Sequence, residues 1–130
     1  MTQEEKQLLI KDLCARIPNH VKVELHGEIC TCLGYFDDFV MLTSNTPLGQ
    51  QTNIDNIKPY LRPMSSMTNE ELKEILSIDY AQIYTGNCWS WNFANHKQID
   101  WLNEHHFDYR GLIERGLAIA VTEENNPYKE

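Results

Sequence analysis

The sequence predicts an α+β fold: a small antiparallel β-meander at about residues 20–43, packed with an N-terminal helix and short C-terminal helices. Val21, Val23 and Leu25 alternate with polar residues, which is the pattern of a half-buried strand. Turn signals follow this strand, and helix-capping patterns lie on both sides of the region. At 130 residues, 42% hydrophobic and 23% charged, the chain has room for one domain, with residues 122–130 expected as a flexible tail.

The N-terminal helix is expected over about residues 2–16. Thr2 and Glu5 have the spacing of a capping box, in which each side chain bonds the other's backbone N–H. Leu9, Leu13 and Cys14 give the helix an apolar stripe. Pro18 follows and ends it.

The first two strands are expected to form a hairpin. His26 and Gly27 can make a two-residue turn, because glycine tolerates a positive φ. The turn predicts three cross-strand pairs, namely Leu25 with Glu28, Val23 with Cys30, and Val21 with Cys32. Both cysteines then share a face with valines, so we expect buried thiols there and not a catalytic pair.

A second tight turn at Asp37 and Asp38 brings in a third strand, residues 39–42. On a period of two, Phe39 and Met41 are expected on the cysteine face. The opposite face then carries Ile29, Leu33, Tyr35, Val40 and Leu42. Since both faces are fairly apolar, we expect helices to cover the sheet at least partly on both sides.

The remaining helices, strands and loops are predicted from turn residues, prolines and helix caps. Residues 44–56 are polar and predict a loop. Two prolines make residues 57–63 extended, with Tyr60 and Leu61 along a sheet edge. Capping boxes predict helices from Thr68 to about Ser77 and from Asn95 to about His105. Asp108 is expected to cap a short helix over residues 109–115, and residues 117–121 to add a strand.

Charge and hydropathy exclude several partners. The net charge is −8, and residues 66–130 carry −6 of it. No block of Lys or Arg is present, so the sequence argues against binding to a nucleic-acid duplex. No apolar run approaches the roughly 20 residues of a membrane span, and the acidic N-terminus is unlike a secretory signal. A cytoplasmic protein with reduced cysteines is expected, its oligomeric state open and a homo-oligomer included.

No motif predicts a metal, a cofactor or a catalytic residue. His105 and His106 are adjacent, and neighbouring side chains on a helix diverge by about 100°, which suits no shared ion. Cys88 has no recognisable base and orienting partner. We therefore expect a protein that is not an enzyme, with a small hydrolase using His105 or His106 as the less favoured alternative.

The most unusual segment is the aromatic run at residues 89–93. Trp89, Trp91 and Phe93 alternate, so in an extended segment their rings project to one side. They form either a hydrophobic layer under the sheet or a stacking wall for a flat ligand. The candidate ligand-binding residues combine this segment with nearby cationic and aromatic side chains: Trp89, Trp91, Arg62, His105, His106, Tyr109 and Arg110.

Two blocks of sequence resemble a known group of proteins. They are IKPYLRPMSSMT at residues 57–68 and DWLNEHHFDYRGLIERGLA at residues 100–118. With the helix end at residues 12–16, they resemble a widespread group of uncharacterised small proteins of Bacteroides and related gut bacteria, and of their phages and prophages. The resemblance implies a phage or mobile-element origin and a location in the host cell cytoplasm.

The same resemblance shapes the functional hypothesis. Small acidic accessory proteins of phages often act by binding, which implies a non-enzymatic protein that sequesters a small anionic nucleotide signal in counter-defence. The alternative is a protein–protein interaction module acting on a host protein.

Overall fold

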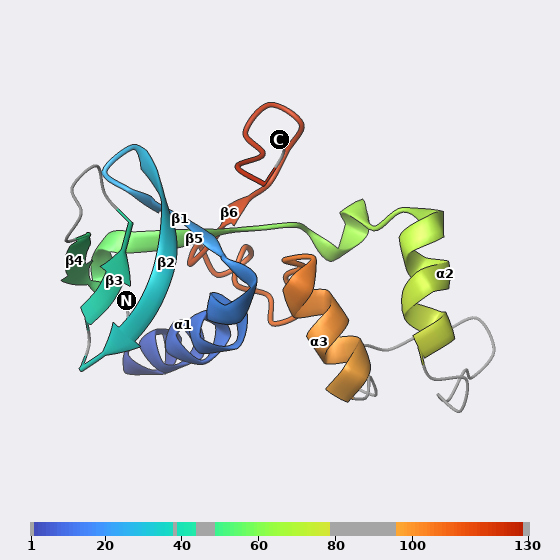
Figure 1. Cartoon of the computed structure of the whole chain (residues 1–130), viewed down its shortest axis with the longest axis horizontal. Helices are drawn as coiled ribbons and strands as arrows, with labels where there is room; N and C mark the ends of the chain where they lie inside the picture. Colours follow the sequence, from blue (N-terminus) through green and yellow to red (C-terminus); the bar gives the residue numbers. More distant parts are fainter. Residues whose placement is uncertain (1, 38, 44–48, 79–95, 129–130) are drawn as a thin grey trace.

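The computed structural model describes residues 2–37, 39–43, 49–78 and 96–128. It confirms an α+β fold, in which a mostly antiparallel sheet of six strands over these residues has the order β4-β3-β2-β1-β5-β6 (Figure 1). The helices are α1 (Gln3–Arg16), α2 (Asn69–Ile78) and α3 (His96–Glu104). The strands are β1 (Lys22–Leu25), β2 (Glu28–Phe36), β3 (Phe39–Leu42), β4 (Gln50–Asn53), β5 (Ile57–Leu61) and β6 (Ile119–Ala120).

Helix α1 begins and ends as the sequence predicts. The Thr2 hydroxyl accepts a hydrogen bond from the Glu5 amide (3.1 Å), and the Thr2 amide donates to the Glu5 carboxylate (3.0 Å). These bonds satisfy N–H groups that the first helical turn leaves without partners. The buried face of α1 carries Leu9 and Leu13, which pack into the main core under the sheet.

The first hairpin is also confirmed, with its exact register. Val23 pairs with Cys30 and Leu25 with Glu28, and the Cys32 amide donates to the Val21 carbonyl. His26 (φ 50°) and Gly27 (φ 86°) form the turn in the left-handed region that such a turn requires. Cys30 and Cys32 are buried, as expected.

The predicted faces of β3 were wrong. Cys32 pairs with Leu42, whereas Gly34 pairs with Met41, so an extra residue in β2 breaks the register between Cys32 and Gly34. Beyond this β-bulge, the residues of β2 and their partners in β3 point to the sheet face opposite the one predicted. Val40 and Leu42 therefore join the cysteines in the core, and Phe39 and Met41 point outward.

Cover was expected on both sheet faces, but no helix among the described residues covers the outer face. That face exposes five large apolar side chains: Ile29, Leu33, Phe36, Phe39 and Met41. Helix α1 packs against the opposite face, where the main core lies (Figure 1). The sheet is thus covered by α1 on one side and presents apolar side chains on the other.

Strands β4 and β5 differ from the sequence prediction. Residues 50–53, expected as loop, pair with β3 despite their polar sequence. Strand β5 is extended as predicted, but it lies between β1 and β6, away from the edge. Its Pro59 pairs with Val23, and since proline has no N–H to donate, this pair is one that exchanges no ladder hydrogen bonds.

Helices α2 and α3 form as predicted and share a second core. Thr68 and Glu71 make a capping box, with bonds of 3.0 and 3.1 Å. Ile75 of α2 packs with Trp101 and Leu102 of α3 in this core. Among the described residues, none of the helices is both long and apolar enough to cross a membrane.

The helix expected at residues 109–115 is replaced by turns. The Asp108 carboxylate does cap this segment, accepting from the amides of Leu112 (2.8 Å) and Ile113 (2.9 Å). Gly111, however, has φ +76°, a value outside the right-handed helical region, so the chain cannot continue as a helix. The strand expected after it forms as β6, which pairs parallel to β5.

Candidate functional site

A hollow of about 750 Å³ lies where the C-terminal segment passes the start of β1, the end of β5 and the end of α3. Its lining is mostly basic, imidazole and amide groups: Asn19, His20, Lys22, Arg62, Glu104, His105, His106, Asn126, Pro127 and Tyr128. Among these described lining residues, Glu104 is the one carboxylate. The hollow therefore differs in charge from the chain as a whole, which carries −8.

Tyr128 forms one wall of the hollow and joins the C-terminal segment to the sheet. Its hydroxyl donates to the Tyr60 carbonyl (2.7 Å) and accepts from the Lys22 amide (3.0 Å). The β1–β5 register, continued by one residue, places these two backbone groups opposite each other. The hydroxyl thus connects the last pair of backbone groups between β1 and β5. Its burial raises the pKa of Tyr128. Residues 122–128, expected as a flexible tail, are tied to the sheet at this point.

His106 forms the inner part of the wall. Its ring stacks on Tyr128 with centroids 3.9 Å apart and planes 9° from parallel. It is 7% exposed and has φ +61°, an unusual conformation for a residue other than glycine. Burial, followed by the charge of Arg16, lowers the pKa of His106 to about 3. The imidazole is therefore neutral at pH 7, and its buried Nδ1 has no hydrogen-bond partner among the described residues.

A buried ionic cluster lies next to His106. Arg16 and Asp12, both on α1 and both fully buried, form an ion pair in which Arg16 Nε donates to the carboxylate (2.9 Å). Arg110 donates to the same carboxylate (2.9 Å), and Arg16 Nη2 donates to the Phe107 carbonyl (2.5 Å). One carboxylate thus faces two guanidinium groups. Arg16 Nη1 is buried and has no partner among the described residues.

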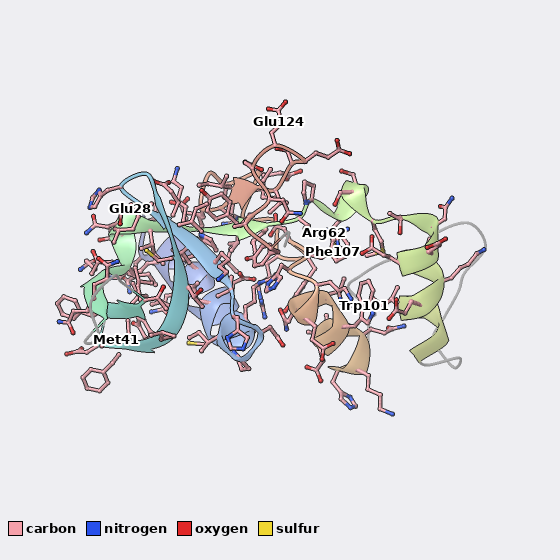
Figure 2. The ribbon with its side chains drawn as sticks, turned by 45° about the horizontal axis from the view of Figure 1, so that its top comes forward. Glu28, Met41, Arg62, Trp101, Phe107 and Glu124 are labelled. Atoms are coloured by element: carbon pink, nitrogen blue, oxygen red, sulfur yellow. The ribbon has the colours of Figure 1, made fainter. Side chains whose placement is uncertain are left out.

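Arg62 lies at the other side of the hollow, where an ion pair, a ring contact and backbone hydrogen bonds fix its position. It makes a bidentate ion pair with Glu71, with both bonds at 2.8 Å. Its guanidinium lies over the Phe107 ring, 4.1 Å from the centroid; Figure 2 shows the two residues next to each other between the sheet and α3. Its backbone bonds His106 and Asp108 on the neighbouring segment. The charge of Arg62 is therefore fixed in place beside the hollow.

His105 belongs partly to the second core. Its ring stacks on Trp101 at 4.0 Å, and its Nδ1 lies 2.9 Å from the Trp101 carbonyl. Trp101 stacks in turn on Phe107 at 5.7 Å. His105 therefore presents only part of its ring to the hollow.

The structure brings three of the candidate residues together and separates two others. Arg62, His105 and His106 line the hollow. Tyr109 and Arg110 do not, because the Tyr109 ring lies against Arg16 and Arg110, and its hydroxyl donates to Asn103 (3.1 Å). Trp89 and Trp91 lie outside the described residues.

Three contributors to this region were not predicted from the sequence. Tyr128 was placed in a free tail, and no local pattern marks its long-range bonds. Lys22 was assigned only to a strand. Arg16 did leave a signal, because it follows Leu9 and Leu13 at helical spacing and so places a charge on the apolar face.

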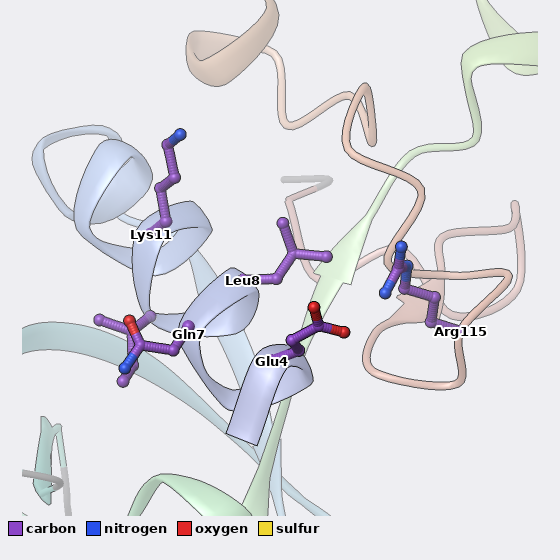
Figure 3. Close-up of a pocket in the computed structure, with 6 residues that line it drawn as sticks. Glu4, Gln7, Leu8, Lys11 and Arg115 are labelled. Atoms are coloured by element: carbon purple, nitrogen blue, oxygen red, sulfur yellow. The ribbon is translucent and has the colours of Figure 1, made fainter. Parts of the chain in front are cut away.

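Two other hollows share Arg115. One, of about 470 Å³, lies along α1 and is lined by Glu4, Leu8 and Lys11, with Arg115 across from the helix (Figure 3). The other, of about 310 Å³, includes Glu5, Asp55 and Lys58. Both linings mix the two signs of charge, and neither contains a stacked pair of rings.

Metal and thiol chemistry receive no support from the described residues. These residues hold no group of three or more His, Cys, Asp or Glu side chains that is placed to bind a metal ion. Burial raises the pKa of both Cys30 and Cys32, the latter to about 11, which favours the unreactive thiol. Cys14 is exposed, and Cys88 lies outside the described part of the chain.

Comparison with known proteins gives no assignment. No protein-family model, no curated protein and no solved structure matches this chain.

Proposed function

We propose that this chain is a non-enzymatic binding protein that holds a small anionic ligand in the hollow beside His106 and Tyr128. The single observation that carries the proposal is the charge of this lining. In the lining, Lys22 and Arg62 contribute two cations and Glu104 one carboxylate, and Glu71, outside the lining, pairs with Arg62. In a chain of net charge −8, a lining with more cations than carboxylates favours an anion at this place.

The buried groups behind the hollow support the same ligand class. Arg16 and Arg110 share one carboxylate, so the cluster next to His106 has more positive than negative charge. Arg16 Nη1 and His106 Nδ1 are buried polar atoms without partners among the described residues. Such atoms are rare in folded proteins, and a bound ion or water molecule is a common explanation for them.

The aromatic wall favours a ligand that also has a flat part. The rings of His106 and Tyr128 stack on each other in this wall, and we infer that a flat ligand extends the stack. A nucleotide combines a flat base with an anionic phosphate, and stacking adds roughly 1–3 kcal/mol per base. We therefore infer a small nucleotide as the ligand. We further propose a role in sequestering a nucleotide signal, which the phage relationship expected from residues 57–68 and 100–118 would imply.

Titration calorimetry tests this function. The probes are inorganic phosphate, adenosine, and a panel of linear and cyclic nucleotides. We expect heat with at least one nucleotide, weaker or no heat with phosphate alone, and none with adenosine. Lys22→Ala is expected to weaken binding, because it removes a cation from the lining. Lys11→Ala, which removes an equal charge from the exposed side of α1, is the matched control.

Salt and pH sharpen the same experiment. Affinity should fall as salt rises, since screening weakens the attraction of an anion to Lys22 and Arg62. Affinity should stay nearly constant from pH 7 to 5.5, where His106 with its pKa of about 3 is neutral. It should rise as the pH falls further toward 3, because a bound anion raises the pKa of His106 and so couples binding to proton uptake. Absence of heat with every nucleotide, or equal weakening by Lys22→Ala and Lys11→Ala, would contradict the proposal.

A further inference from the structure

The outer face of the β2–β3 hairpin carries an unusually apolar surface. We call it the outer patch, and define it by five residues with their exposed fractions: Ile29 (55%), Leu33 (56%), Phe36 (77%), Phe39 (43%) and Met41 (39%). Figure 2 shows Met41 at the outer end of the sheet, away from α2 and α3. The bulge in β2 creates this patch, because it turns Phe36, Phe39 and Met41 to the same side as Ile29.

The size of the outer patch points to an interface. Converted with the full surface of each residue, these exposed fractions amount to roughly 600 Å², which is the upper end of what monomers expose. Two such patches against each other would bury about 1,200 Å², the lower limit of stable protein–protein interfaces. The area that two facing patches would bury is therefore just large enough for a stable interface.

The charge of this face indicates which partner covers it. The outer patch itself has no charged side chain. Beside it on the same face lie Lys22, Glu24 and Lys58, of which Glu24 and Lys58 are cross-strand neighbours. Self-association of a chain of charge −8 is opposed by repulsion between like charges. This face carries two lysines and one glutamate, so the repulsion between two such faces is weaker than the net charge of the chain implies.

The position of the patch excludes cover by α2 and α3. These helices lie toward the end of the molecule opposite the β2–β3 hairpin (Figure 1). Helix α1 lies on the other face of the sheet. Among the described helices, none covers the outer patch.

We propose that the outer patch is the interface of a homodimer, in which two copies of this chain pack face to face about a two-fold axis. A two-fold interface brings the same surface of both copies together, so it requires a self-complementary patch. An apolar strip with flanking charges of both signs meets this requirement. The ends of α3 and the C-terminal segment, which form most of the lining of the hollow beside His106, contribute no residue to the outer patch.

Sedimentation velocity over a concentration series, about 1–100 μM at about 150 mM salt, tests the dimer, since interfaces of this size are often of micromolar affinity. We expect a reversible monomer–dimer equilibrium that strengthens as salt rises, because salt screens the repulsion between acidic chains. Phe36→Glu should raise the dissociation constant at least about tenfold, since it places a charge at the interface. Gln7→Glu, which adds the same charge on the exposed side of α1, should leave it unchanged.

Phe36→Ser guards against an effect of the charge on folding. Phe36 is the most exposed residue of the patch, so this variant should keep the melting temperature of the wild type and still weaken the dimer. A wild-type chain that stays monomeric throughout the series would overturn the proposal. A dimer that survives both Phe36 variants, or that dissociates equally with Gln7→Glu, would overturn it as well.

Discussion

The rings of His106 and Tyr128 stack 3.9 Å apart, and this contact joins two segments that are 22 residues apart in the chain. Tyr128 anchors its side of the stack on the sheet through the Lys22 amide and the Tyr60 carbonyl. His106 anchors the other side, because its carbonyl accepts from the Arg62 amide (2.7 Å). The wall of the candidate site is therefore held by backbone groups of β1, by Tyr60 of β5 and by Arg62 just beyond it.

Tyr128→Phe should destabilise the fold while keeping the ring stack. The variant leaves the Lys22 amide and the Tyr60 carbonyl without the hydroxyl that bridges them, which costs about 1–3 kcal/mol. Urea denaturation measures this loss. Tyr128→Ala should cost more, since it also removes the ring. Equal stability of Tyr128→Phe and wild type would show that the bridge contributes nothing.

His106 should make the protein less stable as the pH falls from about 6.5 to about 3. Its pKa is lower in the folded chain than in the unfolded chain, so the unfolded chain binds more protons in this range. The contribution of His106 is complete above pH 6.5 and is lost progressively toward pH 3. The measurement is the free energy of unfolding against pH.

His106→Asn provides the comparison for that pH profile. Asparagine does not titrate and tolerates the positive φ of this position better than most residues. Subtracting its profile removes the effect of the other histidines. A wild-type profile with the same slope as the variant between pH 4 and 6 would contradict the neutral, buried imidazole.

Asp12→Asn should be among the most damaging single substitutions. It leaves Arg16 and Arg110 without the carboxylate they share, and an unpaired charge at a buried position costs about 3–5 kcal/mol. Thermal and urea denaturation measure the loss. Glu4→Gln, on the exposed side of the same helix, is the matched control and should cost under about 0.5 kcal/mol. Similar stabilities of the two variants would contradict the buried cluster.

Glu71→Gln should weaken the fold modestly and in a pH-dependent way. The side-chain hydrogen bond from Arg62 lowers the pKa of Glu71 to about 2 from its ordinary 4.5. Its contribution is therefore present above pH 4.5 and is lost as the pH falls toward 2. Since both side chains are partly exposed, about 1 kcal/mol is expected at pH 7. Wild type and variant should converge in stability near pH 2, and a constant difference would contradict the ion pair.

Local patterns predicted the parts of the fold that depend on neighbours in sequence. The capping boxes at Thr2 and Thr68 and the turn at His26 involve residues three or fewer positions apart, so the sequence shows them directly. The register of Val23 with Cys30 follows from that turn. The bulge between Cys32 and Gly34 does not follow from the turn. The position of one extra residue in a strand depends on how β3 packs in the core.

The candidate site depends on contacts that local patterns do not record. Arg62 and His106 were selected from their residue types, but their arrangement comes from the parallel contact between Arg62 and Phe107. Tyr128 reaches the sheet across more than 60 residues. The helical spacing of Arg16 with Leu9 and Leu13 was a readable signal, since a charge on an apolar face needs a buried partner.

Nuclear magnetic resonance of the His106 ring nitrogens during a nucleotide titration tests the central claim most directly. We predict a saturable change in the His106 signals and a rise in its pKa, since an anion in the hollow stabilises the imidazolium form. His26, exposed in the β1–β2 turn, is the internal control and should not change. His106 signals and pKa that stay constant at saturating nucleotide would contradict anion binding beside the His106–Tyr128 stack.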